Sequence, residues 1–277
     1  HAEIHALQKA GSNAVNATLY VTLEPCNHVG RTPPCSHAIA GSGISKVVIG
    51  MLDPNPLVDG GGAHYLRKKG ITIVSGVVEE QCRELNRPFL KYISSSLPWL
   101  IMKAGISLDG RISYNVGAGG AITGPESFKQ VHRLRDSVDA ILVGINTIEV
   151  DDPSLTTRLE NKKAHDPIRL ILDTNLRISE NAKVLNQLSS SPSWIFCSKQ
   201  VDEKRIKKLQ SDTIIIHRVN TDENQRLDLN HVLQVAAQHE ILSILVEGGA
   251  AIHGAFLNQK LVDRAYLYYA PLFAGDS

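Results

Sequence analysis

Within the first 35 residues, one histidine and two cysteines have the types and spacing of a catalytic zinc site. They are His1, Cys26 and Cys35. Zinc binds imidazole nitrogen and thiolate sulfur tetrahedrally, and a catalytic site keeps its fourth position for water. Two thiolates and a neutral imidazole balance the charge of the metal, and the bound water then ionises near neutral pH and can attack an amidine-like carbon. The pattern therefore predicts zinc-dependent hydrolytic chemistry.

Deamination also needs a group that carries a proton from the water to the departing ammonia, and Glu3 is the candidate. Residues 1–10 are predicted to form a helix that ends at Gly11. At about 100° per residue, Glu3 points away from His1 on such a helix, which suits a proton shuttle better than a ligand. Cys35 directly precedes a predicted helix at 36–41, and helix starts favour anions, so we expect its thiolate to be favoured there.

Two other interpretations of these residues are weaker. Structural zinc sites have four protein ligands, whereas three ligands beside a glutamate favour catalysis. His1 and His5 have the spacing of the H-E-x-x-H zinc proteases, but that motif needs a glutamate where Ala2 stands. His5 is therefore expected to be a packed helix residue. The remaining histidines and cysteines of interest are not expected to bind the zinc: His28, His37, Cys82 and Cys197.

Composition excludes several function classes. Lysine and arginine total 29, aspartate and glutamate total 28, and the net charge is +1. This balance gives no electrostatic footprint for nucleic acid or for an anionic membrane. No stretch reaches the roughly 20 apolar residues that span a bilayer, and we find no signal-peptide pattern, so a cytoplasmic protein is expected. Four cysteines in 277 residues are too few for a disulfide framework.

Strand-like and helical runs alternate along the chain, which predicts an α/β fold with mostly parallel sheets. The length favours two domains, and the polar segment 94–98, SSSLP, is the expected linker, so the predicted domains are 1–96 and 97–277. Further helices are predicted at 63–70, 79–92, 125–136, 202–210, 228–239 and 250–259. Strands are predicted at 17–24, 46–52, 71–76, 99–106, 140–145, 168–173, 193–198, 213–219, 241–249 and 264–270.

The longer pattern around the zinc residues resembles one known family. Its parts are HAE at 1–3, TLEPCNHVGRTPPC at 22–35 and DPNP at 53–56. The cysteines are separated by a whole loop, whereas the short-spaced nucleobase deaminases have C-x-x-C. The pattern is similar to the bifunctional riboflavin-biosynthesis deaminase/reductases, in which a cytidine-deaminase-like zinc domain precedes a dihydrofolate-reductase-like domain.

The resemblance implies two successive reactions on a small phosphorylated pyrimidine. The first is zinc-dependent deamination of 2,5-diamino-6-(5-phosphoribosylamino)pyrimidin-4-one, with one Zn²⁺ per chain and Glu3 as the catalytic residue. The second is NADPH-dependent reduction of the ribosyl group to ribityl. Homo-oligomeric assembly is also implied. In the first domain Arg31 would meet the phosphate and Asp53 or Asn55 the polar edge of the ring, with ordinary loop residues as the alternative.

On its residues alone, the second half gives one binding signal. The segment 245–257, LVEGGAAIHGAFL, runs from a strand through two glycines into a helix. Such a segment favours phosphate binding at the helix start; the alternative is a tight turn between strand and helix with no ligand. This segment, 103–111 and 132–158 resemble the reductase half of the same family. NADPH contacts are then implied for Gly105, Thr147, Asp151, Thr174, Gly249, Ala250, Ala251, Ile252, His253, Gly254 and Ala255. Substrate contacts are implied for Lys103, Arg135, Leu155, Arg158 and Glu247, the arginines as bidentate phosphate ligands.

One segment departs from the family pattern. Where the family carries G-E-S-x-W-I-T, this chain has GAGGAIT at 117–123, with Gly119 and Ala121 at the serine and tryptophan positions. Tryptophan offers a large flat contact for a ring, so its loss predicts altered reductase activity. This departure leaves open a deaminase with a non-catalytic reductase-like domain. Two further alternatives also stay open: a nucleic-acid base deaminase, and a zinc-stabilised binding module without catalysis.

The two ends of the chain also bear on its activity. It begins inside the zinc motif and ends shortly after the run AYLYYA, at 265–270. By resemblance we interpret it as an internal fragment of a longer protein, with parts missing from both domains. Expressed alone, such a fragment is expected to be poorly stable and weakly active.

Overall fold

Apolar, largely β-branched runs form two separate parallel sheets, one in each of two units, His1–Ser95 and Ser96–Ser277. The computed structural model describes residues 1–29, 33–55, 61–114, 120–160 and 164–275. Every strand pair recorded in these ranges within the two sheets is parallel. The predicted α/β class is therefore confirmed.

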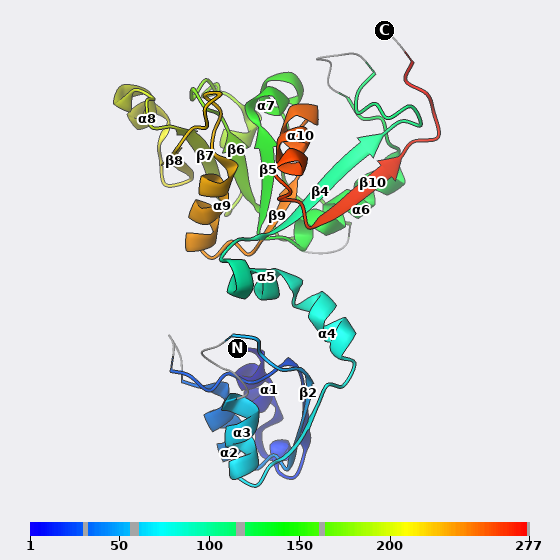
Figure 1. Ribbon diagram of the computed structural model, residues 1–277, viewed down its shortest axis with the longest axis vertical. Helices are drawn as coiled ribbons and strands as arrows, with labels where there is room; N and C mark the ends of the chain where they lie inside the picture. The colour runs from blue at the N-terminus through cyan, green and yellow to red at the C-terminus, as the bar shows by residue number, and fades with distance from the viewer. Residues whose placement is uncertain (30–32, 56–60, 115–119, 161–163, 276–277) are drawn as a thin grey trace. The chain divides into compact units, whose positions relative to one another are not determined.

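The first unit has a three-stranded sheet in the order β1-β2-β3, and Figure 1 labels its middle strand, β2. Its core joins α2 and α3 to β2 through buried side chains such as Ile39, Leu66 and Ile49. The elements, in chain order, are α1 (Ala2–Ala10), a 3-10 turn η1 (Gly11–Ala14), β1 (Thr18–Leu23), α2 (Cys35–Gly41), β2 (Lys46–Met51), α3 (Gly61–Lys68), β3 (Thr72–Ser75), α4 (Glu79–Leu85) and α5 (Arg87–Ser95).

The second unit has a seven-stranded sheet in the order β10-β4-β9-β5-β6-β7-β8. The elements are β4 (Trp99–Ile106), α6 (Pro125–Asp136), β5 (Ala140–Gly144), α7 (Ile145–Asp151), β6 (Ile168–Leu172), a 3-10 turn η2 (Lys183–Leu185), β7 (Ser193–Ser198), α8 (Glu203–Leu209), β8 (Ile214–Val219), α9 (Leu229–Gln238), β9 (Ser243–Val246), α10 (Ala250–Asn258) and β10 (Arg264–Tyr269).

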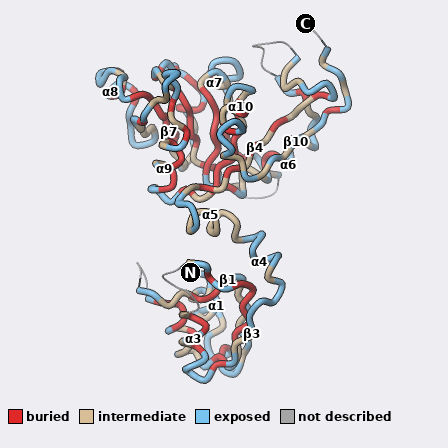
Figure 2. The backbone as a smooth tube through the Cα atoms, viewed as in Figure 1, coloured by how far each residue is buried: buried red, intermediate tan, exposed pale blue. Residues whose placement is uncertain are grey.

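Helices cover both faces of the central strands of this sheet, as the alternation of side chains along a strand requires. Leu142 and Phe196 pack with α9 and α10 on one face. Ile141, Ile195 and Cys197 pack with α7 and α8 on the other. The buried strands stand out in Figure 2 as a red core between paler helices. Continuous apolar strands such as β7 are therefore explained by burial on both faces.

Parallel strands bring all their carboxyl ends to one edge of a sheet, which is where ligands bind in open α/β folds. In the first unit β1 leads into Glu24–Cys26 and β2 leads into Asp53–Asn55. In the second unit β9 leads into Glu247 and β6 leads into Asp173. Several residues singled out from the sequence, among them Cys26, Asp53 and Glu247, therefore lie at these two edges.

Two differences from the predicted elements have local causes. The predicted helix 79–92 is two helices, because Asn86 ends α4 by donating from Nδ2 to the Cys82 carbonyl at 2.8 Å, and Pro88 then starts α5. The helix α7 was not predicted, since its sequence INTIEVD is short and rich in β-branched residues of low helix propensity. Among the described residues, none of the helices is long and apolar enough to cross a membrane.

Candidate active sites

The three predicted zinc ligands meet at the carboxyl edge of the first sheet. His1 caps α1, Cys26 follows β1 and Cys35 begins α2, and their ligand atoms all lie within 4.8 Å of one another. His1 Nδ1 is 3.7 Å from Cys26 Sγ. A tetrahedral zinc, with bonds of about 2.3 Å to sulfur and about 2.0 Å to nitrogen, holds such atoms about 3.6 Å apart. The donor set and its spacing fit a zinc ion.

The ionisation of Cys35 differs from the sequence-based expectation. The side chain is fully buried, and its backbone N–H donates to Cys26 Sγ at 3.3 Å. Burial, then the charge of Glu3 and the hydrogen bond with Cys26, raise the pKa of Cys35 to about 12. Without a cation, burial thus opposes the thiolate expected at the start of α2. Coordination to a cation deprotonates such a thiol outright, so metal binding here releases a proton.

A cavity of about 600 Å³ opens beside the cysteines and brings Glu3 to the predicted substrate loops. His1, Glu3, Cys26, Asp53 and Asn55 all line it. Asp53 accepts the backbone N–H of Asn55 at 2.9 Å, which fixes the turn after β2. Burial raises the pKa of Asp53, against the opposing effects of this hydrogen bond and of His28. The cavity thus combines two of the three zinc ligands, His1 and Cys26, with carboxylates and polar groups. Arg31 lies outside the described residues.

Glu24 is a structural residue of this site that the sequence analysis did not single out. Its carboxylate is buried and accepts two backbone N–H groups, from Asp53 at 3.1 Å and from Ala63 at 2.8 Å. Ala63 lies in the first turn of α3, where N–H groups lack partners within the helix. A Cβ on Gly62 would lie 1.9 Å from the Pro25 carbonyl oxygen, so α3 begins directly against the cysteine loop. The sequence signal that could have identified Glu24 is a carboxylate at the end of an apolar strand.

Replacing Glu24 by glutamine is expected to destabilise the first unit by about 1.5 to 3 kcal/mol, the usual value of hydrogen bonds to a charged group. Glutamine has only one acceptor oxygen, so its NH₂ group would face one of the two backbone N–H groups, which would then lack an acceptor. Thermal unfolding of the zinc-loaded protein by circular dichroism, with the rate of zinc loss to a chelator, measures the effect. The matched control is Glu79→Gln on α4, whose carboxylate is half-exposed beside Arg83 and should shift stability by less than about 0.5 kcal/mol. Equal effects of the two substitutions would contradict the role given to Glu24.

The other histidines and cysteines have separate surroundings. The ring of His37 stacks on Tyr65 with centroids 4.6 Å apart, and His28 lines the cavity. Neither belongs to the group of three ligand atoms, within the part of the chain that the structure describes. His5 is exposed, so the expectation that it is packed is wrong; α1 buries none of its residues. Cys82 and Cys197 are buried, as expected of structural thiols.

A second cavity, of about 790 Å³, lies at the carboxyl edge of the seven-stranded sheet. We call it the inner cavity. Lys103 and Gly105 on β4, Asp151 at the end of α7, and Glu247 after β9 line it. His253 on α10 also lines it. Residues from four separate elements thus converge on one space, as parallel strands ending at a common edge allow.

Oppositely charged side chains contact one another at the inner cavity. Arg135 donates from Nε to Glu247 Oε1 at 2.8 Å and from its NH2 nitrogen to Oε2 at 2.9 Å. Lys103 Nζ lies 3.9 Å from Glu247 Oε2. Burial alone would raise the pKa of Glu247, but Arg135 and Lys103 outweigh it and lower that pKa. Burial lowers the pKa of Lys103, with Glu247 opposing. The lysine is thus a buried amine beside a fixed carboxylate.

Three predicted substrate residues are arranged differently from the expectation. The Arg135 fork is occupied by Glu247, and its NH1 nitrogen donates to the Thr156 carbonyl at 2.9 Å, so protein groups engage this arginine here and its bidentate phosphate contact stays a prediction. Leu155 is 3% exposed and belongs to the core, which leaves a substrate contact to its backbone. Arg158 is exposed, and its backbone N–H donates to His132 Nδ1 at 3.2 Å. None of these three lines the inner cavity.

A neighbouring cavity of about 810 Å³, the outer cavity, lies on the other side of the start of α10. The two cavities share Asn146, Thr147, Gly249 and Ala250. Gly249 caps α10 without a side-chain hydrogen bond, so the first N–H groups of the helix are available to an anion. A Cβ on Gly248 would lie 2.9 Å from Ile252, so close packing requires this glycine. Every predicted NADPH contact lines one cavity or both: Gly105, Thr147, Asp151, Thr174, Gly249, Ala250, Ala251, Ile252, His253, Gly254 and Ala255.

The segment that departs from the family pattern also borders the inner cavity. Ala121 and Thr123 line it, and the Thr123 side chain packs against Gly105, where a Cβ would meet its Cγ2 at 3.0 Å. Phe128, 42% exposed near the start of α6, lines the same space. Gly119 lies outside the described residues. An aromatic side chain therefore borders this cavity, although the family's tryptophan position holds Ala121.

Comparison with known proteins agrees with this arrangement. Residues 98–277 match the RibD C-terminal domain, and residues 1–51 match the cytidine and deoxycytidylate deaminase zinc-binding region. The chain is 41% identical to the riboflavin biosynthesis protein RibD of Bacillus amyloliquefaciens, over 100% of this chain and 73% of that protein.

Solved structures give the same result. Acinetobacter baumannii RibD, form 1, superposes with a TM-score of 0.86 at 35% identity, over 100% of this chain and 75% of that one. A structure from Thermotoga maritima, a diaminohydroxyphosphoribosylaminopyrimidine deaminase/5-amino-6-(5-phosphoribosylamino)uracil reductase, gives 0.83 at 32% identity, with the same coverage of 100% and 75%. The likeness extends over both units of the chain.

Proposed function

This chain belongs to the RibD family, the bifunctional deaminase/reductases of riboflavin biosynthesis, and we propose that it catalyses the two reactions named for its Thermotoga maritima relative. The first unit deaminates 2,5-diamino-6-(5-phosphoribosylamino)pyrimidin-4-one. The second reduces the ribosyl group of the resulting 5-amino-6-(5-phosphoribosylamino)uracil to ribityl, with NADPH as hydride donor. Homo-oligomeric assembly stays a prediction from the family resemblance, and a cytoplasmic location stays a prediction from the sequence pattern.

The first reaction exchanges an amino group for a carbonyl oxygen. One water adds to the amino-bearing ring carbon and one ammonia leaves. His1, Cys26 and Cys35 would hold a zinc ion, which would supply an activated water. Glu3 is the group that would accept a proton during the attack and return it to the departing nitrogen. Asp53 and Asn55 in the same cavity supply polar groups for the ring edge.

The second reaction is a two-electron reduction. Bound NADPH would supply the hydride for the first carbon of the ribosyl group, and one proton would complete the change. We assign the nicotinamide and the reacting carbon to the inner cavity, because its walls carry Lys103 and Glu247. The cofactor diphosphate would lie at the start of α10, whose uncapped N–H groups favour a negative charge.

The observation that carries this proposal is a cluster of three zinc-ligand atoms, two of whose residues, His1 and Cys26, line one cavity with Glu3. The test uses the zinc-loaded full chain, the diaminopyrimidine substrate and NADPH in one tube. Ammonia release and nicotinamide absorbance are followed together. We expect ammonia to appear first, and NADPH oxidation to follow and to depend on the deaminated product.

The two halves of the proposal can fail separately. NADPH oxidation after ammonia release would show that Ala121 is tolerated at the family's tryptophan position. Ammonia without oxidation would contradict the reductase assignment and favour a non-catalytic second domain. The absence of ammonia, with zinc bound, would contradict the deaminase assignment or its substrate. Supplying 5-amino-6-(5-phosphoribosylamino)uracil directly tests the second unit whatever the first one does.

A further inference from the structure

The outer cavity extends the proposed cofactor site away from the reacting groups. It continues from the start of α10 across the carboxyl ends of β5 and β6, where Gly144, Leu172 and Thr174 line it. The two cavities share Gly249 and Ala250, so a dinucleotide whose diphosphate lies there, with its nicotinamide in the inner cavity, can place its adenosine half in the outer cavity.

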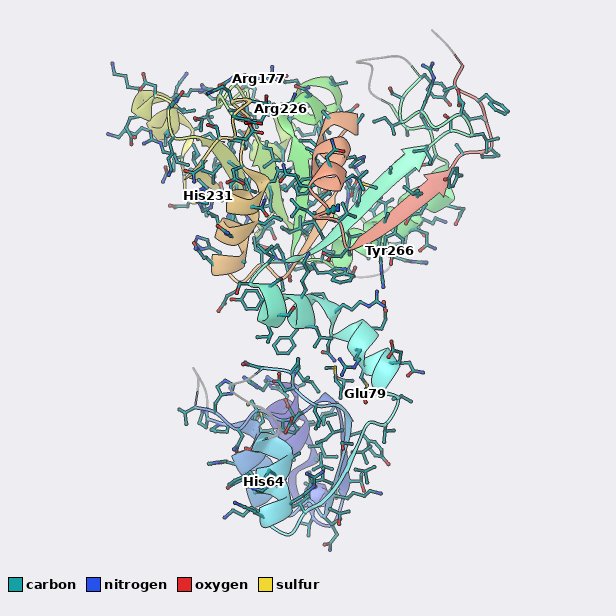
Figure 3. The ribbon with its side chains drawn as sticks, viewed as in Figure 1. His64, Glu79, Arg177, Arg226, His231 and Tyr266 are labelled. Atoms are coloured by element: carbon teal, nitrogen blue, oxygen red, sulfur yellow. The ribbon has the colours of Figure 1, made fainter. Side chains whose placement is uncertain are left out.

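Two arginines line the outer cavity and are not among the residues that line the inner one. Arg177 lies in the loop after β6, and Arg226 lies in the loop between β8 and α9. The second loop is a tight hairpin, closed by an antiparallel bridge between Thr221 and Leu227 and by the Asp222 N–H donating to the Arg226 carbonyl at 2.7 Å. Figure 3 shows both arginines at the same edge of the second unit. Two separate loops therefore bring guanidinium groups to one space.

The two arginines differ in their present contacts. Arg177 is 3.1 Å from Glu149 and also donates to the Asn146 side chain, yet its side chain is still 49% exposed. Arg226 is exposed and forms no ion pair with any residue in the described part of the chain. Its positive charge is therefore available to a ligand, and Arg177 keeps free N–H groups beside it.

The carboxylates that share this cavity are turned toward the backbone. Asp222 Oδ1 accepts the N–H groups of Asn224 and Arg226, at 2.9 Å and 2.8 Å. Asp173 Oδ2 accepts the Ile178 N–H at 2.8 Å, and the whole residue is 1% exposed. An acidic residue at the end of a strand selects NAD when it accepts the ribose 2′-hydroxyl, whereas a nearby arginine accommodates the 2′-phosphate of NADP. Asp173 is too buried for the first role.

We propose that Arg177 and Arg226 together bind the 2′-phosphate of the adenosine half of NADPH, and that they set the preference of this enzyme for NADPH over NADH. Guanidinium groups bind phosphate oxygens through pairs of parallel hydrogen bonds. The 2′-phosphate of NADPH carries a negative charge, whereas the ribose of NADH has an uncharged hydroxyl at the same position. The inference rests on the proposed reductase function and assigns its cofactor specificity to two named residues.

The experiment compares binding of 2′,5′-ADP with binding of 5′-AMP by calorimetry, using the full chain. The variants are Arg226→Ala, Arg177→Ala, Arg177→Lys and the double alanine substitution. Because each arginine contributes charged hydrogen bonds, each alanine variant should lose about 10- to 100-fold in affinity for 2′,5′-ADP and keep its affinity for 5′-AMP. Arg177→Lys should lose less, since it keeps the charge without the fork. The matched control is Arg133→Ala, an exposed arginine of α6 that lines neither cavity.

Steady-state kinetics separates this inference from the proposed function. We expect the double variant to raise the KM for NADPH, to leave the KM for NADH and the kcat nearly unchanged, and so to remove the discrimination between the two. Undiminished preference for NADPH in a folded double variant would overturn the subsite while leaving the reductase function intact. Failure of the unmodified protein to bind or oxidise either nicotinamide would overturn the reductase function and the subsite with it.

Discussion

Replacing Glu3 by glutamine is expected to lower the rate of ammonia release by about 10²- to 10⁴-fold, the usual contribution of a positioned general acid–base group. Glutamine has nearly the same size but cannot take and return a proton. Glu3 is not one of the three clustered ligand atoms, and it lines the cavity beside them. Zinc content should therefore stay at one ion per chain, which metal analysis of the purified variant measures.

The second unit gives an internal control for this variant. When 5-amino-6-(5-phosphoribosylamino)uracil is supplied directly, NADPH oxidation by Glu3→Gln should equal that of the unmodified protein, because Glu3 belongs to the other unit. A zinc-stabilised module without catalysis predicts no change in any assay after this substitution. Ammonia release within about threefold of the unmodified rate, with zinc retained, would therefore remove Glu3 from the proton transfer.

Local patterns in the sequence predicted the zinc site because its geometry is carried by short segments. His1 begins a helix, Cys26 follows a strand, and Cys35 begins another helix, so the positions of three element ends decide where the ligands meet. Strands buried on both faces were also recognisable as apolar runs; the predicted strands 99–106 and 193–198 are those of β4 and β7.

Long-range pairing is what the sequence did not predict. Arg135 and Glu247 are 112 positions apart, and nothing near either residue indicates that they bind each other rather than a ligand. Both were expected to hold the substrate, whereas the arginine fork is occupied by the carboxylate. The burial of Leu155 was missed for a similar reason, since its side chain joins a core made by elements distant in sequence. Arg177 and Arg226 meet at one cavity only because two loops fold to the same sheet edge.

The ion pair between Arg135 and Glu247 makes the second large prediction. Their side chains are 13% and 8% exposed, so replacing Arg135 by methionine leaves a buried carboxylate without its hydrogen-bonded partner, although Lys103 stays 3.9 Å away. Removing one partner of a buried pair costs about 3 to 5 kcal/mol, whereas replacing both partners by neutral groups costs far less. We therefore expect a large loss for Arg135→Met and substantial recovery when Glu247→Gln is added.

Both tryptophans, Trp99 and Trp194, lie in the second unit, so urea unfolding followed by tryptophan fluorescence measures the stability of that unit alone. Arg133→Ala, on the exposed side of the same helix, should change it by less than about 0.5 kcal/mol. A loss below about 1 kcal/mol for Arg135→Met would contradict the buried fork.

The cost of Arg135→Met should also depend on pH in a definite direction. In the unmodified protein the pKa of Glu247 is lowered from its usual 4.5, because Arg135 and Lys103 outweigh the opposing effect of burial. The pair therefore contributes its stability above that usual pKa and loses it as pH falls through the lowered one.

Without Arg135, burial is less opposed and raises the pKa of Glu247, so the variant recovers stability as the carboxyl group takes up a proton. The stability difference between the two proteins should accordingly be largest at neutral pH, and it should shrink as pH falls from the raised pKa of Glu247 in the variant to the lowered pKa in the unmodified protein. A difference that is constant from neutral to acid pH would mean that lost packing, rather than the unpaired charge, accounts for the effect.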